Sequence, residues 1–367
     1  MKVPFVDLKK QYLSIKKEID TSIQRNINNT SFIGGSDLDK FSNKLSSLLG
    51  VKHVIPVANG TDAIYISLKM LGIGPGDEVI TTAHSWISTS ETISQTGAKP
   101  VFVDTNDYFC ISPEKIESKI TSRTKAIIPV HLYGHAADMT SIIKLAKRHS
   151  LYVIEDCAQA ILTKWKNKYV GTIGDVGTIS FFPGKNLGAF GDAGAIITNS
   201  SKKAKSFRMY ASHGGLSKHE HKIEGINSRM DTIQAGILNV KMRYIKKWIS
   251  DRQSAASLYF KNLEGCDDID VPLIHTDCDH TFHLFVIKTK KRDYLASFLR
   301  KNGISTGIHY PSALPLLECY KSQKNKKSDF EKAYNDSKSI ISLPIYPEIT
   351  EGQIKFVSNK VKEFFSK

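Results

Sequence analysis

Short apolar runs alternate with amphipathic stretches along the chain between about residues 50 and 200. The runs expected to form strands are 54–58, 79–82, 100–104, 125–130 and 151–156, and the stretches expected to form helices are 61–71, 86–96 and 139–149. The strand runs are almost continuously apolar, which is typical of parallel strands covered on both faces. The pattern therefore predicts an α/β fold in which helices cover a mainly parallel sheet.

Polar residues stand at or just beyond the carboxyl ends of four of these expected strands. They are Asn59, Asp104, His131 and Asp156. In open α/β sheets, ligands bind outside the carboxyl ends of the strands. We therefore expect these four residues to lie near one functional site.

The C-terminal third of the chain has fewer elements. Apolar residues recur at three- and four-residue steps between residues 230 and 262, which predicts one long helix with a packing stripe. A strand over 282–288, a helix over 293–301, a strand near 304–308 and a C-terminal helix from Gln353 follow. We interpret the chain as a large domain over 1–245 and a smaller α/β domain over 246–367.

Charge and hydropathy change this picture little. The 367 residues carry a formal charge of +15, but the lysines are spread along the chain without a recognition-helix pattern, so nucleic-acid binding is not expected. Bilayer spanning needs an apolar run of ~18 residues, and the chain has none. The first residues also lack the apolar stretch of a secretion signal. We expect a cytoplasmic protein with no membrane partner.

Cysteine and histidine usage argues against a metal or disulfide framework. The five cysteines are scattered and never form a C-x-x-C pair. His213, His219 and His221 cluster, but no cysteine or carboxylate completes a ligand set at metal spacing. A solvated loop is the expected structure there.

Two glycine-containing segments are candidate phosphate sites. At residues 58–63 a strand ends, Gly60 permits a tight turn, and Thr61 or Asp62 can cap the next helix, whose first N–H groups would bind an anion. Such junctions are common, so this signal is weak alone. The Gly-rich segment 72–76 resembles a dinucleotide-binding loop, but it follows a helix and precedes a strand, which is the reverse of that motif. A Rossmann oxidoreductase is therefore rejected.

Asp156 and Lys185 are the residues with the clearest chemical potential. Asp156 ends a buried strand, where an aspartate is usually a turn or capping residue; the functional alternative is a carboxylate that faces a pyridinium nitrogen. Lys185 lies in a Gly-rich turn between two apolar β runs, whereas lysine normally occupies solvated faces. Beside a cofactor aldehyde its amine would form an imine and later move a proton. Ser180 could donate a hydrogen bond to a phosphate oxygen.

These motifs together resemble the DegT/DnrJ/EryC1/StrS family of sugar aminotransferases, which belong to the fold-type I class of pyridoxal-phosphate enzymes. The matching segments are N-G-T-D-A at 59–63, E-D-C-A-Q at 155–159, S-F-F-P-G-K at 180–185 and N-S-R-M-D at 227–231. The likeness extends over nearly the whole chain, from P-F-V-D-L at 4–8 to H-Y-P at 309–311. It implies an aminotransferase-like fold with a large cofactor-binding domain and a smaller C-terminal domain.

The resemblance also implies a role for each matching residue. Lys185 would bind pyridoxal 5′-phosphate covalently and act as the acid–base catalyst. Asp156 would pair with the pyridine nitrogen, and Gln159 would bond the ring hydroxyl. Trp86 would lie against the cofactor ring, and Gly60, Thr61 and Ser180 would bind the phosphate. Asn227 would bind the phosphate in the neighbouring subunit of a homodimer. Arg229, His309 and Tyr310 would lie near the sugar nucleotide.

The activity that the resemblance implies is transfer of an amino group from L-glutamate to a nucleotide-linked keto sugar. Carbon 3 of a dTDP-3-keto-6-deoxyhexose, in surface polysaccharide or glycan biosynthesis, is the first expectation. A UDP-linked 3-keto sugar and a 4-keto sugar stay open, because segments 133–138 and 315–317 depart from the family pattern near the sugar.

Two other functions are weighed against this activity. A sugar dehydratase of the same fold is disfavoured, because those relatives carry histidine at the position of Lys185. A non-catalytic regulatory or nucleic-acid-binding protein is a remote alternative, since it would need neither Lys185 nor Asp156.

Overall fold

A seven-stranded sheet forms the centre of the computed structural model, which describes residues 1–217 and 219–366. The strand order is β1-β9-β8-β5-β4-β2-β3. The strands are β1 (His53–Val57), β2 (Glu78–Thr82), β3 (Lys99–Val103), β4 (Thr124–Ile128), β5 (Tyr152–Asp156), β8 (Val176–Ser180) and β9 (Gly194–Thr198). β9 pairs antiparallel with β1 and β8, and the other pairs are parallel. The expected mainly parallel α/β sheet is confirmed.

The two faces of this sheet are covered by different helices, because neighbouring apolar residues of a strand point to opposite faces. Val153 belongs to the core cluster on one face, and Ile154 belongs to the cluster on the other. The first cluster includes residues of α2 (Lys16–Asn28), α3 (Ser36–Leu49), α7 (Met139–Arg148) and α9 (Thr232–Lys241). The second includes residues of α4 (Gly60–Met70), α5 (Ser88–Gln95) and α8 (Ser201–Ala211).

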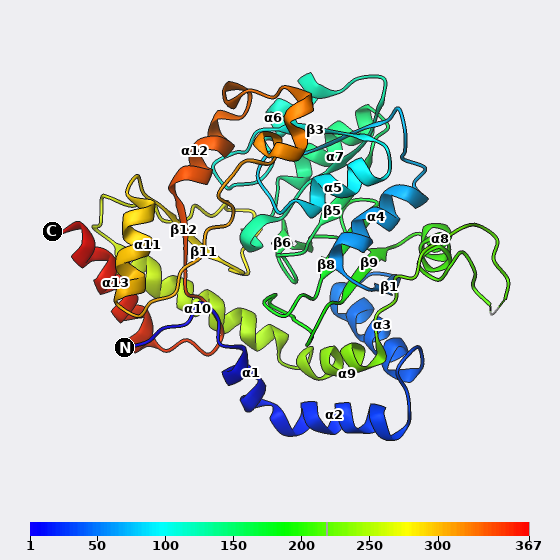
Figure 1. Cartoon of the computed structure of the whole chain (residues 1–367), viewed down its shortest axis with the longest axis horizontal. Coiled ribbons are helices and arrows are strands. Elements are labelled where there is room, and N and C mark those ends of the chain that lie inside the picture. Colours follow the sequence, from blue (N-terminus) through cyan, green and yellow to red (C-terminus); the bar gives the residue numbers. More distant parts are fainter. Residues whose placement is uncertain (218, 367) are drawn as a thin grey trace.

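A separate core lies at the end of the molecule where both termini are found (Figure 1). It is built from α10 (Ile245–Leu263), α11 (Arg292–Lys301), α13 (Glu351–Phe365) and the antiparallel pair β11 (Phe285–Lys288) and β12 (Ile340–Leu343), and Val3 joins it. The shorter elements are α1 (Leu8–Ser14), α6 (Pro113–Ile116), α12 (Glu331–Ser339), β6 (Lys164–Trp165), β7 (Lys168–Tyr169) and β10 (Cys278–Asp279). In the described parts of the chain, no helix has both the length and the apolar character to cross a bilayer.

Two expected elements are corrected by the structure. The single helix predicted over 230–262 is two helices, α9 and α10, separated at 242–244. There the backbone bonds shorten to three-residue turns, with Arg243 N–H donating to Val240 C=O. The first turns of α10 still pack in the core under the sheet, and the helix enters the C-terminal core only from Ala255 on. The strand predicted near 304–308 forms only isolated bridges, because Ile304 pairs with Val3 and Gly307 pairs with Ser342.

Candidate active site

An anion cradle forms where β1 ends and α4 begins. The side chain of Asn59 accepts a hydrogen bond from Asp62 N–H at 2.8 Å and so caps α4. Gly60 and Thr61 are the first residues of this helix, so their N–H groups have no acceptor within it. A Cβ at Gly60 would lie 2.7 Å from Ser180 Cβ, so only glycine lets the helix start approach Ser180 this closely. The first N–H groups of α4 and the hydroxyls of Thr61 and Ser180 therefore border the same cavity, where they can bind a phosphate group.

Asp156 lies at the carboxyl end of β5 and is almost fully buried. Its carboxylate accepts hydrogen bonds from Thr89 Oγ1 at 2.9 Å and from Ala158 N–H at 3.1 Å. Burial raises the pKa of Asp156, and the two hydrogen bonds and the charge of Lys185 oppose that rise. The carboxylate is therefore poorly compensated by the chain itself and favours a cationic partner.

Lys185 is held in a tight turn between β8 and β9. Its backbone N–H donates to Phe182 C=O at 2.8 Å. Gly188 closes the turn, where a Cβ would lie 2.2 Å from Pro183 C=O. Burial lowers the pKa of the Lys185 amine to about 8, against the attraction of Asp156. Such an amine is more readily deprotonated, and hence more nucleophilic, than a solvated lysine.

Lys241 of α9 is fully buried and connects this helix to the turn that carries Lys185. Its ammonium group donates to Gly188 C=O at 2.6 Å and lies 4.7 Å from the centre of the Phe190 ring. Gln234 adds two bonds to the backbone of Phe190. These contacts fix the segment that follows Lys185.

Aromatic and amide groups form the opposite wall. Gln159 accepts from Tyr133 N–H and donates to the Tyr310 hydroxyl at 2.9 Å. The Tyr310 ring lies 5.6 Å from that of Trp86, which is 58% exposed. His309 bonds Ser342 Oγ at 2.8 Å, and burial lowers its pKa to about 4, so its ring is neutral at pH 7.

All these groups line one cavity of about 750 Å³. Of the residues named from the sequence, the structure places the following in its wall: Gly60, Thr61, Trp86, Asp156, Gln159, Ser180, Lys185, His309 and Tyr310. Asn227 and Arg229 are exposed and lie outside the cavity of their own chain. Ser228, between them, is buried and accepts a hydrogen bond from Ala58 N–H at 3.2 Å.

Several residues of the wall were not predicted from the sequence. Ser85, Ser88 and Thr89 follow the carboxyl end of β2, and the strand-end rule that selected Asp156 would have found them. Arg252 and His283 enter from the C-terminal part of the chain. No local pattern marks these two residues.

Two of the four strand-end residues expected at the site do not reach it. Asp104 accepts bonds from Ala333 N–H and from the ammonium of Lys115, which ties β3 to α12. His131 is fully buried and does not line the cavity.

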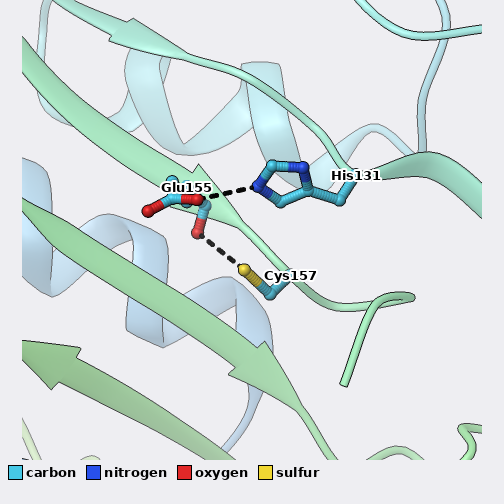
Figure 2. Close-up of side chains that lie close together, drawn as sticks. All are labelled: His131, Glu155 and Cys157. Carbon is cyan, nitrogen blue, oxygen red and sulfur yellow. Dashed lines mark hydrogen bonds and ion pairs between the residues drawn. The ribbon is translucent and has the colours of Figure 1, made fainter. Parts of the chain in front are cut away.

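His131 forms a buried cluster with Glu155 and Cys157 (Figure 2). His131 Nε2 lies 3.1 Å from Glu155 Oε2, and His131 Nδ1 accepts from Ala137 N–H at 3.0 Å. The Glu155 carboxylate also accepts from the N–H groups of Gly171, Ile173 and Gly174. The potential metal-ligand atoms of His131 and Glu155 are thus already hydrogen-bonded, so the arrangement is a structural network.

The cavity has what a phosphorylated aldehyde cofactor with a pyridine ring requires. The cradle at Gly60 suits the phosphate, the amine of Lys185 suits the aldehyde, and the carboxylate of Asp156 suits a protonated ring nitrogen. With the α/β sheet, this set of groups defines the class of pyridoxal-phosphate-dependent enzymes.

Comparison with known proteins identifies the family within this class. Residues 13–362 match the DegT/DnrJ/EryC1/StrS aminotransferase family, and the chain belongs to that family. A protein from Geobacillus stearothermophilus named pleiotropic regulatory protein is 43% identical, over 100% of this chain and 99% of its own length. A dTDP-3-amino-3,4,6-trideoxy-α-D-glucose transaminase from Streptomyces venezuelae is 37% identical, over 99% of this chain and 96% of its own length.

A UDP-linked relative and a solved structure extend the comparison. The UDP-N-acetyl-3-dehydro-α-D-glucosamine 3-aminotransferase of Acidithiobacillus ferrooxidans is 38% identical, over 98% of this chain and 97% of its own length. The crystal structure of S. venezuelae DesV in complex with a ketimine intermediate superposes with a TM-score of 0.98 at 36% identity, covering 100% of this chain and 99% of that one. The fold and the catalytic class expected from the sequence are confirmed.

Proposed function

We propose that the protein uses pyridoxal 5′-phosphate to transfer an amino group from L-glutamate to carbon 3 of a dTDP-linked 3-keto-6-deoxyhexose. The observation that carries the proposal is the placement of Lys185, Asp156 and the Gly60 cradle around one cavity. When bound, the cofactor supplies an aldehyde carbon and an electron-withdrawing ring, through which an amino group passes between donor and acceptor. The similarity to the S. venezuelae transaminase supports a dTDP-linked sugar.

The proposal assigns roles to the following residues of the cavity wall. Lys185 anchors the aldehyde carbon and moves a proton at the carbon that carries the amino group. Asp156 keeps the ring nitrogen protonated through its carboxylate. Gly60, Thr61 and Ser180 bind the phosphate, Gln159 contacts the ring hydroxyl, and Trp86 lies against the ring. His309 and Tyr310 face the sugar nucleotide.

The test is a substrate panel combined with mapping of the modified lysine. Purified protein should show a pyridoxal absorbance band, and borohydride reduction should attach the cofactor to Lys185. Lys185→Ala should have no turnover. With L-glutamate as donor, a dTDP-linked 3-keto sugar should turn over faster than UDP- and GDP-linked 3-keto and 4-keto sugars. A reduced adduct on another lysine would contradict the site, and preference for another sugar would contradict only the substrate.

A UDP-linked 3-keto sugar is the second candidate substrate, favoured by the relative from A. ferrooxidans. A regulatory role is the remote alternative, and the name of the G. stearothermophilus relative is consistent with it. A purely regulatory or nucleic-acid-binding protein needs no desolvated amine beside a buried carboxylate. Absence of the absorbance band and of all turnover would favour that alternative. In the enzymatic proposal, the product feeds surface polysaccharide or glycan synthesis in the cytoplasm.

The proposal includes a homodimer with shared active sites. Asn227 is exposed, although the neighbouring Ser228 packs beside the end of β1. Phe182 and Trp86 at the cavity are 56% and 58% exposed, and a second subunit would cover such aromatic surface. In this arrangement Asn227 binds the phosphate, and Arg229 contacts the sugar nucleotide, in the neighbouring subunit's cavity.

Mixed dimers test the shared site. Lys185→Ala and Asn227→Ala should each be severely impaired as pure dimers. A hybrid of the two would contain one site with both lesions and one site with neither. Refolding an equal mixture should restore about a quarter of the wild-type activity, because about half of the dimers are hybrids with one intact site. No recovery, with hybrids verified by differently tagged chains, would rule out the shared site.

A further inference from the structure

Arg252 is a buried cation whose charge is not used by the chemistry described so far. It lies in α10, is 4% exposed and lines the same cavity as Lys185. Burial lowers its pKa to about 10, so the guanidinium stays charged at pH 7. A buried charge is costly unless a counter-charge compensates it. The question is which anion compensates Arg252.

The hydrogen bonds of Arg252 leave one edge of the guanidinium without a partner. Nη1 donates to the carbonyl oxygens of Phe282, His283 and Ile345 at 3.3, 3.3 and 2.9 Å. These three bonds fix the orientation of the guanidinium plane. Nε is buried and has no acceptor, and no bond of Nη2 is found among the described residues. The Nε–Nη2 edge is the fork that binds a carboxylate through two parallel hydrogen bonds.

No carboxylate of the described chain pairs directly with this edge. The charge of Glu348 raises the pKa of Arg252, but the two side chains form no ion pair within 4 Å, and Glu348 does not line the cavity. Arg292 offers a contrast. It is also buried, its Nη1 also bonds backbone carbonyls, and its Nε also has no hydrogen-bond partner. The difference is that Arg292 forms an ion pair, with Nε 2.5 Å from Asp293 Oδ1.

Arg252 is also the remaining cation of the cavity. Lys185 and Arg252 are the two cationic side chains in the described wall, since His283 and His309 are neutral. Burial lowers the pKa of His283 well below its ordinary value, and the charges of Lys185 and Arg252 lower it further, so both cations act on this one ring. Lys185 is engaged with the aldehyde carbon. Within this chain, Arg252 is therefore the cation left to bind an anionic donor that brings its amine to that carbon.

We propose that Arg252 binds a carboxylate of the amino donor and so selects an amino acid as the amine source. This inference rests on the proposed aminotransferase function and adds the residue that recognises the donor. The keto sugar has no carboxylate for Arg252 to bind. The donor half-reaction therefore depends on Arg252, whereas the acceptor half-reaction does not.

The experiment separates the two half-reactions in the loaded enzyme. Arg252→Gln should raise the KM for L-glutamate about tenfold to a hundredfold, because a charge-assisted bidentate contact is lost. The rate at which the pyridoxamine-loaded variant aminates the keto sugar should stay within about twofold of wild type. Arg252→Lys should bind glutamate with an intermediate KM, because it keeps the charge but loses the fork. The matched control Arg292→Gln removes a buried arginine outside the cavity and should leave the KM for glutamate unchanged.

A binding measurement gives a readout that does not depend on turnover. Glutarate, a dicarboxylate without an amine, should bind the wild-type holoenzyme in calorimetry and lose that binding in Arg252→Gln. Equal impairment of both half-reactions, or unchanged glutarate binding, would overturn the proposal and leave Arg252 as a support for the wall. If both variants fail to fold, a crystal structure of the wild-type holoenzyme with glutarate decides, since a carboxylate bound away from Arg252 would overturn it. Wild-type enzyme inactive with L-glutamate would instead contradict the proposed function.

Discussion

Glu155 and Asp156 are adjacent carboxylates on β5, but strand alternation places them in opposite surroundings. Glu155 accepts one hydrogen bond from His131 (Figure 2) and three from backbone N–H groups of the segment 171–174. Asp156 accepts two and lines the cavity. The same chemical group is therefore satisfied by the chain in one case and poorly compensated in the other.

The comparison teaches that burial alone does not separate a catalytic carboxylate from a structural one. Both side chains are almost fully buried. What differs is how many donors the protein supplies, and hence whether the carboxylate has capacity left for a ligand. On this criterion Glu155 holds the backbone of 171–174 in place, and Asp156 is available to a cationic ring nitrogen.

The largest effect on the reaction rate is expected from Asp156→Asn. A neutral amide cannot hold the ring nitrogen protonated, and the lost charge-assisted hydrogen bond alone costs ~1.5–3 kcal/mol, or about tenfold to a hundredfold in rate. The fold should persist: the new amide oxygen accepts from Ala158 N–H, and the new amide nitrogen donates to Thr89, whose hydroxyl can donate to Ser85 Oγ. Single-turnover kinetics and thermal melting of the apoprotein check both parts. Near-normal turnover would mean that Asp156 is only a strand-end residue.

The sequence was sufficient to find Asp156, Lys185 and Gly60, because each lies where a local pattern changes. Asp156 and Gly60 follow apolar strands, and Lys185 interrupts two apolar runs with a Gly-rich turn. The sheet was also predictable, since its strands are short and nearly continuously apolar. The division into domains at residue 245 and the role of each site residue stay predictions.

Other features depend on contacts that no local pattern encodes. The break between α9 and α10 has no proline or glycine, and Val240 before it and Ile245 after it pack in the same core. His131 lies just beyond β4, much as Asp156 lies at the end of β5, but its ring is directed to Glu155. The unpartnered edge of Arg252 becomes visible only when the carbonyls that bind Nη1 are known.

The second effect is expected from Glu155→Gln, and it should appear in stability. The amide nitrogen of glutamine would face donors whichever way the amide turns, since both carboxylate oxygens accept from two N–H groups. His131 cannot accept through Nε2 and keep its bond from Ala137 N–H, because Nδ1 already serves as the acceptor. Each buried donor left unsatisfied costs ~1–3 kcal/mol, so we expect a loss of about 2–5 kcal/mol in the free energy of unfolding.

Urea unfolding of the apoprotein measures this loss, with Asp156→Asn as the matched carboxylate-to-amide control. Asp156→Asn should lose activity and keep its stability. Glu155→Gln should be less stable but should keep its activity when it is bound to cofactor and assayed below its melting temperature. Equal stability losses in the two variants would mean that the number of hydrogen bonds does not distinguish these carboxylates.

The smallest effect is expected from Thr89→Val, which removes one of the two donors to Asp156 and keeps the shape of the side chain. The Thr89 hydrogen bond lowers the pKa of Asp156, so its loss should raise that pKa further above the ordinary carboxyl value. A protonated Asp156 cannot hold the ring nitrogen charged. The acid limb of the kcat profile should therefore move to higher pH, and the rate at pH 7 should fall by about fivefold for a loss of ~1 kcal/mol.

Thr92→Val is the matched control for this variant, because Thr92 lies in the same helix and is also buried, but its hydroxyl donates to Ser88 C=O. It should leave the pH profile in place. A rate loss in Thr89→Val without movement of the acid limb would show that Thr89 supports the wall without adjusting the carboxylate. Movement to lower pH would contradict the sign of the hydrogen-bond effect. The expected result would show that the few hydrogen-bond donors around Asp156 determine its catalytic role, as the many donors around Glu155 determine its structural role.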